Sequence, residues 1–325
     1  MMIHLKIEDQ RPHRLPFYLA MEEWAAANLP ATEYFFSWQV NPTVIFGRNQ
    51  RIDLEVNLDY CRENSIETYR RKSGGGCVFA DRHNIMFSYI TPSEHVTTTF
   101  ARYTSMIADM LRSLGVNAEA TGRNDITIDG RKVSGNSFYH VPGRSIVHGT
   151  MLYDTDFRHM ANAITPSRSK LESKMVKSVP SHITTLSRHL SMTIDRFHEY
   201  AVSYLTDSEL ILNDAQIAEI EQLERPYYNP EWIFGRRSSA TLHHSRRIDS
   251  VGEFAVGIDL REGRIADINI EGDFFLLSDL DSTLLDRLRN VRYTDADIEG
   301  ALAGIDTSEI IAGLSTRQFI DLIIN

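Results

Sequence analysis

The first regular pattern along the chain is an apolar stripe with helical spacing in residues 15–29. Apolar residues that recur at intervals of three and four predict one buried face of an amphipathic helix. The apolar side of this predicted helix consists of Leu15, Tyr18, Leu19 and Trp24. We expect Glu22 and Glu23 to lie on the opposite, outward face.

Runs of β-branched and aromatic residues follow, and turn residues separate them. Residues 33–40 and 43–47 are two such runs, and Asn41-Pro42 between them predicts that they pair as a hairpin. Asp129-Gly130 is the strongest short hairpin signal in the chain. Pro142-Gly143 marks another turn. Further strands are expected over residues 66–71, 77–79, 85–90, 126–128, 132–134, 137–140 and 145–153, and helices over residues 54–64 and 100–114.

These elements predict a mixed α+β domain with much antiparallel pairing, rather than alternating βαβ units. Residues 156–224 are expected to be mostly helical or irregular. Near Arg246 the pattern changes, because residues 253–260 and 264–271 alternate like paired strands. Helices are expected after them, over residues 279–288, 295–303, 308–314 and 316–324. The sequence therefore predicts one domain over 1–246 and a small α/β C-terminal domain over 247–325, with an extension of a single domain as the alternative.

Composition narrows the class of protein. A chain of 325 residues with 42% hydrophobic residues can bury a sizeable core, and no apolar run reaches the length of a membrane span. The net charge of −10 argues against nonspecific nucleic-acid binding, which depends on neutralising phosphates. Two cysteines, Cys61 and Cys77, give neither a disulfide framework nor metal-ligand spacing. A cytoplasmic protein that binds neither membrane nor nucleic acid is the simplest expectation.

Candidate chemistry is concentrated in residues 69–84, YRRKSGGGCVFADRHN. Three successive glycines weaken any helix or strand, and they suit a place where the backbone bends sharply or approaches a ligand. Successive exposed N–H groups form a concavity for anions, and Arg70, Arg71 and Lys72 add positive charge beside it. The run predicts a phosphate or nucleotide cradle. Taken alone, a flexible loop with solvated basic residues explains it equally well.

Two further blocks stand at defined distances from this run. They are GRNDITIDGRKVSGN at residues 122–136 and HGT at residues 148–150. In this order, the three blocks resemble the lipoate–protein ligase A family, and FFSWQVNPTVIFGRNQ at residues 35–50 is similar to that family's early hairpin. The resemblance is clear over most of residues 15–190. It implies a class II biotin/lipoate ligase-like catalytic domain, with a mixed antiparallel sheet and flanking helices, followed by an accessory domain.

The resemblance also implies a reaction. ATP would activate lipoate as lipoyl-AMP, and the lipoyl group would pass to a lysine of a lipoyl-domain acceptor, either an E2 subunit of a 2-oxoacid dehydrogenase or the glycine-cleavage H protein. Such a site must bring a carboxylate and a phosphate together, and their repulsion is large where water is excluded. Fixed cationic donors offset that repulsion and stabilise charge that develops in the transition state.

Site residues follow from the matched motifs. Lys132 corresponds to the lysine that contacts both the acyl carbonyl and the phosphate, Arg71 corresponds to a phosphate-contacting arginine, and Asp125 is a candidate Mg²⁺ ligand. The remaining expected nucleotide and lipoyl contacts are Ser73, Gly74, Gly75, Gly76, Cys77, Val78, Phe79, Asn84, Ser134, Gly135, His148 and Gly149, with Asn136 as a supporting hydrogen-bonding residue. Phe36, Trp38 and Val44 are candidate walls of an apolar tunnel for the lipoyl tail, although ordinary core positions explain them as well.

Two other activities remain open. Cys77 could act as a thiolate nucleophile beside Arg71 and Lys72, which would give an ATP-independent octanoyl or lipoyl transferase; a small buried cysteine is the simpler explanation. Positions where the family usually has other residues, Ala80, His83 and Val147, favour a non-catalytic lipoate-binding protein as a further alternative. The lysine, the arginine and the glycines of the motifs are nevertheless intact.

Overall fold

The computed structural model describes residues 1–325 apart from 9–10, 94, 123, 165–181, 236–239 and 325. The chain divides into two compact units. The first consists of Met1–Ile45, Asp53–Arg70 and Val78–Ile233, and the second of Phe46–Ile52, Arg71–Cys77 and Phe234–Asn325. The second unit therefore combines the C-terminal part of the chain with two short segments from its N-terminal part.

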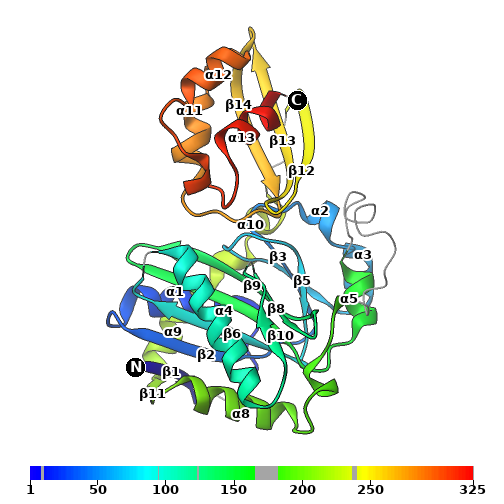
Figure 1. The fold of residues 1–325 in the computed structure, drawn as a ribbon, viewed down its shortest axis with the longest axis vertical. Helices are drawn as coiled ribbons and strands as arrows, with labels where there is room; N and C mark the ends of the chain where they lie inside the picture. The colour runs from blue at the N-terminus through cyan, green and yellow to red at the C-terminus, as the bar shows by residue number, and fades with distance from the viewer. Residues whose placement is uncertain (9–10, 94, 123, 165–181, 236–239, 325) are drawn as a thin grey trace. The chain divides into compact units, whose positions relative to one another are not determined.

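A mixed eight-stranded sheet, in the order β11–β1–β2–β6–β10–β9–β8–β7, forms the centre of the first unit (Figure 1). Its strands are β1 (Met2–Ile7), β2 (Glu33–Trp38), β6 (Asn84–Thr91), β7 (Ala118–Ala120), β8 (Asp125–Ile128), β9 (Arg131–Val141), β10 (Arg144–Leu152) and β11 (Ser208–Leu212). β1 pairs in parallel with β2 and β11, whereas the other neighbours are antiparallel. The expected predominance of antiparallel pairing is confirmed.

Residues 33–40 and 43–47 do not form the expected hairpin. β2 pairs with β1 and β6, while β3 (Thr43–Phe46) belongs to a separate three-stranded sheet, in the order β4–β3–β5, with β4 (Glu67–Arg70) and β5 (Val78–Ala80). That prediction was wrong because a turn signal marks a change of direction but does not select the partner of each strand. β1, α1 (Leu15–Asn28) and β2 also form one βαβ unit, which the sequence pattern did not indicate.

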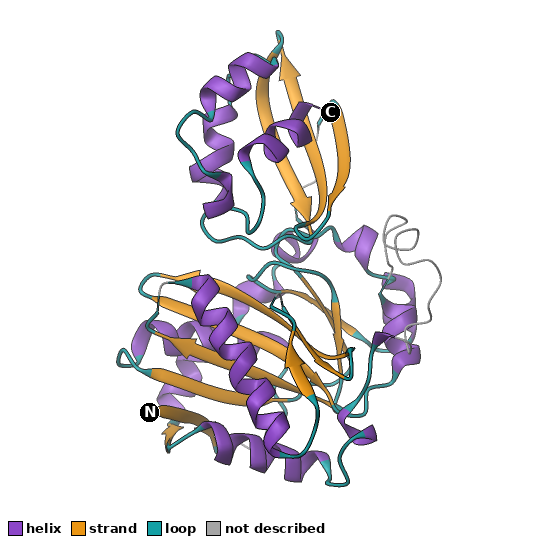
Figure 2. Cartoon of the chain, in the orientation of Figure 1, coloured by secondary structure: helices purple, strands orange, loops and turns teal. Residues whose placement is uncertain are grey.

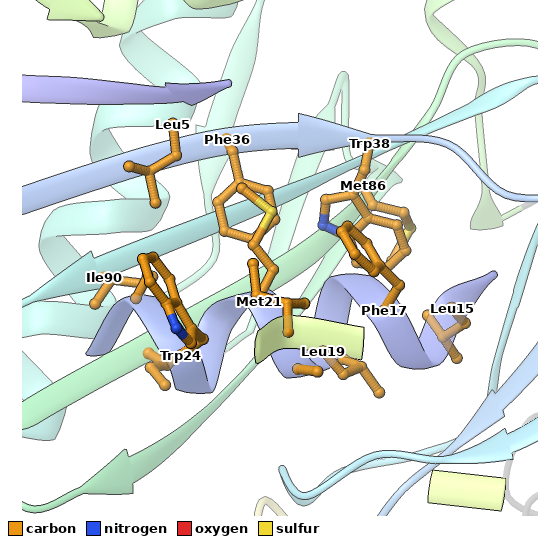
Figure 3. Packing of buried hydrophobic residues seen from close by; sticks show 14 of the residues in the cluster. Leu5, Leu15, Phe17, Leu19, Met21, Trp24, Phe36, Trp38, Met86 and Ile90 are labelled. Atoms are coloured by element: carbon orange, nitrogen blue, oxygen red, sulfur yellow. The ribbon is translucent and has the colours of Figure 1, made fainter. Parts of the chain in front are cut away.

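Helices cover both faces of the large sheet (Figure 2). On one face α1 packs with α9 (Asp214–Leu223), and Figure 3 shows side chains of the sheet, such as Phe36 and Met86, pointing toward α1. On the other face lie α4 (Val96–Ser113) and α8 (Ile194–Leu205), where Tyr103 of α4 stacks on Tyr89 of β6 with ring centroids 5.9 Å apart. The predicted helices over 15–29 and 100–114 are confirmed.

Shorter elements complete the first unit. Two short helices, α2 (Ile52–Glu55) and α3 (Leu58–Glu63), replace the single helix expected over 54–64. Among residues 156–224, the range 165–181 lies outside the described residues, and β11 is a strand that the sequence pattern did not indicate. The remaining helical segments are α5 (Phe157–Ala163), η1 (Leu186–Arg188), η2 (Arg225–Tyr228) and α10 (Pro230–Phe234), of which α10 ends at the start of the second unit.

The C-terminal part of the second unit has its own antiparallel sheet and core. β12 (Leu242–Ile248), β13 (Gly252–Arg261) and β14 (Arg264–Gly272) pair in that order. A π-helical turn η3 (Asp281–Leu285), α11 (Asp286–Leu288), α12 (Asp295–Ala301), a 3₁₀ turn η4 (Thr307–Glu309) and α13 (Thr316–Ile324) follow. The strands expected over 253–260 and 264–271 are confirmed. β12 was missed because most of its side chains are polar and exposed, and only η4 forms where a helix over 308–314 was expected.

Within the described parts of both units, no helix is long and apolar enough to cross a membrane.

Candidate active site

The β8–β9 hairpin carries the candidate catalytic lysine, and its turn is the one predicted. Asp129 and Gly130 have φ angles of 49° and 74°. Left-handed conformations at both central residues are what a two-residue type I′ turn requires, and they explain the Asp-Gly pair. The turn therefore fixes where β9 begins, immediately before Lys132.

A one-residue bulge lies in β9 directly after this turn. Asp125 pairs with Gly135, yet Thr127, two residues further along β8, pairs with Lys132, three residues back along β9. Val133 is therefore the extra residue. In a regular strand Lys132 and Gly135 would point to opposite faces, because successive side chains alternate. The bulge brings them onto the same face, in keeping with the way bulges re-aim side chains.

The ammonium group of Lys132 lies against a carboxylate and a glycine. Its Nζ is 2.7 Å from Oδ1 of Asp125. A Cβ placed on Gly135 would lie 2.8 Å from that Nζ, so the glycine leaves the space that the end of the lysine occupies. The lysine and aspartate side chains are 35% and 31% exposed, so both are partly open to solvent.

The backbone of Lys132 is held on both sides. Thr127 of β8 is its partner on one side, and Ile183 bridges to it in parallel on the other. The amide of Thr184 donates a hydrogen bond of 2.8 Å to the Lys132 carbonyl. These contacts fix the base of the side chain, and Asp125 holds its end, so the ammonium has a defined place, which is the condition for electrostatic stabilisation of a transition state.

Three other expected residues stand on β9 and β10 near this lysine. Ser134 is buried, and its Oγ donates to Oδ1 of Asn136 at 3.3 Å. Gly149 of β10 lies directly opposite Asn136. Gly149 and Ser134 therefore shape the surroundings of the Asn136 amide.

His148 belongs to a buried polar network centred on Glu22. The carboxylate of Glu22 accepts hydrogen bonds from Ser88 Oγ at 2.5 Å and from the Tyr139 hydroxyl at 3.2 Å, and His148 Nδ1 lies 3.0 Å from each carboxylate oxygen. Ser88 Oγ accepts in turn from Nε1 of Trp38 at 2.9 Å. A carboxylate withdrawn from water is tolerated where polar partners surround it in this way.

The outward placement expected for Glu22 is therefore wrong, since its exposure is 0%. The polar partners of Glu22 stabilise its carboxylate in the interior. Burial, together with the Glu22 charge, raises the pKa of Tyr139 well above the usual value of a tyrosine. A signal was present in the sequence. Glu22 falls seven residues after Leu15 and thus lies on the apolar stripe itself.

The guanidinium of Arg71 is folded into its own loop. Nε donates to Ser73 Oγ at 2.9 Å, and Nη2 donates to the carbonyls of Gly74 and Gly76 at 2.6 Å and 2.7 Å. Burial lowers the pKa of Arg71 to about 10, and the nearby Cys77 thiol acts in the opposite direction. Cys77 is half-buried and forms no disulfide. Arg71 thus shapes the glycine-rich loop and keeps its positive charge at the loop's centre.

The consecutive glycines have different surroundings. A Cβ on Gly74 would lie 2.4 Å from the carbonyl oxygen of Phe274, and one on Gly75 would lie 2.9 Å from the ring of Phe275. The amide of Gly75, whose φ is +82°, donates to the same Phe274 carbonyl at 3.1 Å. A Cβ on Gly76 would meet nothing within 4 Å. Packing within the second unit thus accounts for Gly74 and Gly75, and the space at Gly76 leaves room for a ligand.

The expected residues after the loop line β5 and the start of β6. Val78 is half-buried, and Phe79 is fully buried with its ring stacked on His159 at 6.3 Å. Nδ2 of the buried Asn84 donates to the Phe79 carbonyl at 3.3 Å, and the Thr155 hydroxyl donates to Oδ1 of Asn84. Phe79 and Asn84 therefore stabilise the local fold.

The expected site residues thus fall into two sets, one in each compact unit. The set in the first unit comprises Val78, Phe79, Asn84, Asp125, Lys132, Ser134, Gly135, His148 and Gly149. The set in the second comprises Arg71, Ser73, Gly74, Gly75, Gly76 and Cys77. The first set offers a fixed ammonium group and the second a buried guanidinium inside a loop rich in glycine. Both are suited to carboxylate or phosphate groups.

Comparison with known proteins gives the family. The model of the lipoyl protein ligase A/B catalytic domain matches residues 15–206, and the model of the bacterial lipoate protein ligase C-terminus matches residues 238–323. The lipoate–protein ligase LplJ of Bacillus subtilis is 33% identical, over 98% of this chain and 99% of its own length. Lipoate–protein ligase 1 of Staphylococcus aureus is also 33% identical, over 94% of this chain and 95% of its own.

Solved structures agree on the fold. LipL1 of P. falciparum, crystallised with lipoate, has a TM-score of 0.77 at 19% identity, covering 100% of this chain and 98% of its own. A lipoate–protein ligase A bound with ATP has a TM-score of 0.62 at 20% identity, covering 72% of this chain and 99% of its own. These neighbours confirm the expected fold class. On the family models and the full-length relatives together, the chain belongs to the lipoate–protein ligase family.

Proposed function

We propose that this protein uses ATP to activate lipoate as lipoyl-AMP and then transfers the lipoyl group to a lysine of an acceptor protein. The observation that carries the catalytic part is the bulge in β9, which holds the Lys132 ammonium beside Asp125 and above Gly135. Relatives aligned over nearly their full length are named lipoate–protein ligases. Solved structures with this fold were obtained with lipoate and with ATP.

In the first step a lipoate oxygen attacks the α-phosphorus of ATP, the bond to the β-phosphate breaks, and pyrophosphate leaves. The attacking carboxylate and the phosphate are both anions. We assign to Lys132 the task of lying between them, because a fixed ammonium lowers their repulsion without reorganising. Arg71 and the amides around Gly76 are the proposed contacts for the phosphates and the lipoyl carboxylate.

Mg²⁺ is the proposed metal of the first step. Among the described residues, no three His, Cys, Asp or Glu side chains gather in a metal cluster. Asp125 fits the role of a single protein ligand, because Mg²⁺ often takes one or two carboxylates and completes its shell with phosphates and water. When bound, the ion would neutralise charge on the leaving pyrophosphate. Asp125 would then serve the metal through one oxygen while Oδ1 stays near Lys132.

In the second step the neutral amine of an acceptor lysine attacks the acyl carbon, AMP leaves, and the amine nitrogen loses a proton. The proposed acceptors are lipoyl domains of 2-oxoacid dehydrogenase E2 subunits and the glycine-cleavage H protein. One support is an archaeal neighbour of this fold, with a TM-score of 0.65, described as a lipoate protein ligase and its E2 lipoyl domain. The proposed place of action is the cytoplasm, where Cys61 and Cys77, which form no disulfide, would stay reduced.

An ATP-independent acyl transferase is the second candidate. It is favoured by the half-buried thiol of Cys77, which forms no disulfide and lies close to the Arg71 guanidinium. In that reaction the thiolate would attack an acyl-carrier thioester, expel the carrier thiol and pass the acyl group to the acceptor lysine. The two candidates require different residues, so substitutions separate them.

The first experiment mixes the protein with lipoate, ATP, Mg²⁺ and an apo lipoyl domain, and weighs the acceptor by mass spectrometry. A lipoyl mass gain that needs ATP is expected. Lys132→Ala should slow adenylate formation by roughly 10²- to 10³-fold, the typical cost of one transition-state donor. Lys6→Ala, on an exposed lysine of β1, is the matched control and should react normally.

The outcomes separate the candidates. ATP-independent transfer from an acyl-carrier protein that disappears in Cys77→Ala would replace the ligase by the transferase. Binding of lipoate without any turnover would instead identify a binding protein.

A further inference from the structure

Gly149 and Asn136 face each other across the β9–β10 pair, and the space between them is too small for a side chain at position 149. A Cβ on Gly149 would lie 1.8 Å from Oδ1 of Asn136 and 2.7 Å from its Cγ. The buried Asn136 amide therefore fills the space that any side chain at position 149 would need.

The Asn136 amide is committed to one carbonyl. Its Nδ2 donates to the carbonyl oxygen of Asn124 at 3.0 Å, and its backbone N–H donates to the same oxygen at 2.8 Å. Oδ1 accepts from Ser134 Oγ at 3.3 Å. Two donors converging on one carbonyl fix the position of the peptide that follows Asn124, which is the peptide that enters Asp125.

Asp125 is also held on its other side. Its carbonyl accepts from the backbone N–H of Thr121 at 3.0 Å and from the Thr121 hydroxyl at 3.1 Å. Its side chain, through Oδ1, lies 2.7 Å from Nζ of Lys132. The backbone on which this carboxylate stands is thus fixed by Asn136 and Thr121, and the carboxylate in turn fixes the lysine ammonium.

We infer that Asn136 is a positioning residue: through the Asn124 carbonyl it sets the place of Asp125, and through Asp125 it aims the ammonium of Lys132, while Gly149 provides the space in which the amide lies. The inference deepens the proposed function, since it rests on Lys132 as the cation of the activation step. Asn136 itself touches no reacting atom in this scheme.

The test compares Asn136→Ala, Gly149→Ala and the double variant. Both single variants should lower kcat for lipoyl-adenylate formation by roughly 100-fold, the scale expected for a misplacement of about 1 Å, with a much smaller change in KM. Gly149→Ala should also lower Tm, because the new methyl group displaces the amide. The double variant should have a higher Tm than Gly149→Ala, since the clash with the amide is gone and the nearest remaining atom is the Gly135 carbonyl oxygen at 3.2 Å, yet it should stay as slow as either single variant.

Two substitutions serve as matched controls. Gly300→Ala adds a methyl group where nothing lies within 4 Å. Asn269→Ala removes an amide whose Nδ2 donates to Glu271 Oε1 at 3.1 Å, on β14 of the second unit. Both should leave kcat unchanged. Asn136→Asp, which keeps the shape but loses the Nδ2 donor, should be as slow as Asn136→Ala.

A second measurement does not depend on activity. Brief treatment with acetic anhydride, followed by peptide mass spectrometry, gives the acetylation rate of Lys132 relative to Lys6 in the same sample. An amine that has lost its ion pair with Asp125 is more accessible to the reagent. The acetylation rate of Lys132 should therefore rise several-fold in the Asn136 and Gly149 variants and not in the controls.

Either of two results would overturn the inference. One is an unchanged Lys132 acetylation rate in Asn136→Ala. The other is a variant that loses Tm while its kcat stays normal, which would make the amide purely structural. If the unaltered protein forms no adenylate at all, the proposed function fails, and the acetylation rates still decide whether Asn136 positions Lys132.

Discussion

At the scale of single residues, the sequence motifs pointed to the charged residues of the candidate site, and the structure explains the glycines near them by packing. Lys132 and Asp125 were predicted, and the structure places them 2.7 Å apart. The reason for Gly135 could not be read from the sequence, because it depends on where the flexible lysine side chain ends. Glu22 was placed outward because it carries a charge, although its position on the apolar stripe indicated burial; its polar partners, which come from strands distant in sequence, could not be foreseen.

A pair of histidines gives the clearest pH dependence. Nε2 of His198 on α8 lies 2.5 Å from Ser37 Oγ, and burial lowers its pKa despite the opposing charges of Asp195 and Glu199. Burial also lowers the pKa of His4, and the nearby His198 adds to that shift. In both cases the unfolded chain binds protons more readily than the folded one. Stability should therefore fall as the pH drops below 6.5, the ordinary histidine value.

We predict that His198→Gln flattens this pH dependence. The variant cannot take up the proton that favours unfolding, so its urea midpoint should change less between pH 7.5 and pH 5 than that of the unaltered protein. His243→Gln, on an exposed histidine of β12, should keep the full dependence. Equal slopes for all three proteins would contradict the assignment.

At the scale of elements, local signals identified the helices and the tight turns but not the pairing of strands. The Asp129-Gly130 turn was read correctly because its conformation is decided by two residues. The pairing partners of β2 and β3 were not predicted correctly, since strand pairing depends on contacts between segments distant in sequence. The bulge at Val133 was equally invisible, because register is a property of the pair and not of either strand.

The bulge leads to a prediction about chain length. Inserting one alanine after Val133 leaves Lys132 opposite Thr127, next to the turn, but shifts Gly135 relative to Asp125 and to the lysine. The end of the lysine then loses its place above Gly135 and beside Asp125, so adenylate formation should be lost while the fold is retained by circular dichroism. Val133→Ala keeps the residue count and thus the face of Lys132. It should remain active at a cost of roughly 2 kcal/mol in the free energy of unfolding for the lost buried methyl groups. An active insertion variant would refute the role of the bulge.

The Glu22 network joins α1 to the sheet, and it should dominate the stability of that contact. Glu22→Ala leaves the polar groups of Ser88, Tyr139 and His148 without their shared partner. We expect a loss of about 3–5 kcal/mol in the free energy of unfolding, measured by urea titration. Glu63→Ala, on the exposed side of α3, should change it by about 0.5 kcal/mol or less. Similar losses of stability in Glu22→Ala and Glu63→Ala would show that the Glu22 network contributes no more to stability than an exposed carboxylate does.

At the scale of the whole molecule, the notable feature is that compact units and chain order do not coincide. Residues 46–52 and 71–77 pack with the C-terminal part of the chain. The amide of Gly272 donates to the Asn49 carbonyl at 2.7 Å, and the Gly75 amide donates to the Phe274 carbonyl. A change of pattern along the sequence can mark only one point at which one domain ends and the next begins. The sequence therefore could not show that two short internal segments belong to the unit of the C-terminal part.

Neighbouring glycines should therefore respond differently to the same substitution. Gly74→Ala puts a methyl group 2.4 Å from a backbone oxygen, and we expect a loss of roughly 1–3 kcal/mol in unfolding free energy. Gly76→Ala meets no atom within 4 Å and should leave the unfolding midpoint unchanged. Thermal unfolding of both variants checks this. Equal destabilisation would mean that packing against Phe274 does not explain Gly74.

The shared unit also limits how such a protein can be recombined. A chimera that takes only its last third from a relative would set foreign residues at positions 272–275 against native ones at positions 49 and 74–75. Three separated stretches of the gene have to be exchanged together for the contacts to match. The C-terminal region is therefore constrained to evolve together with two short internal segments. Chimeras with a single crossover at the start of the C-terminal region are expected to be less stable than either parent.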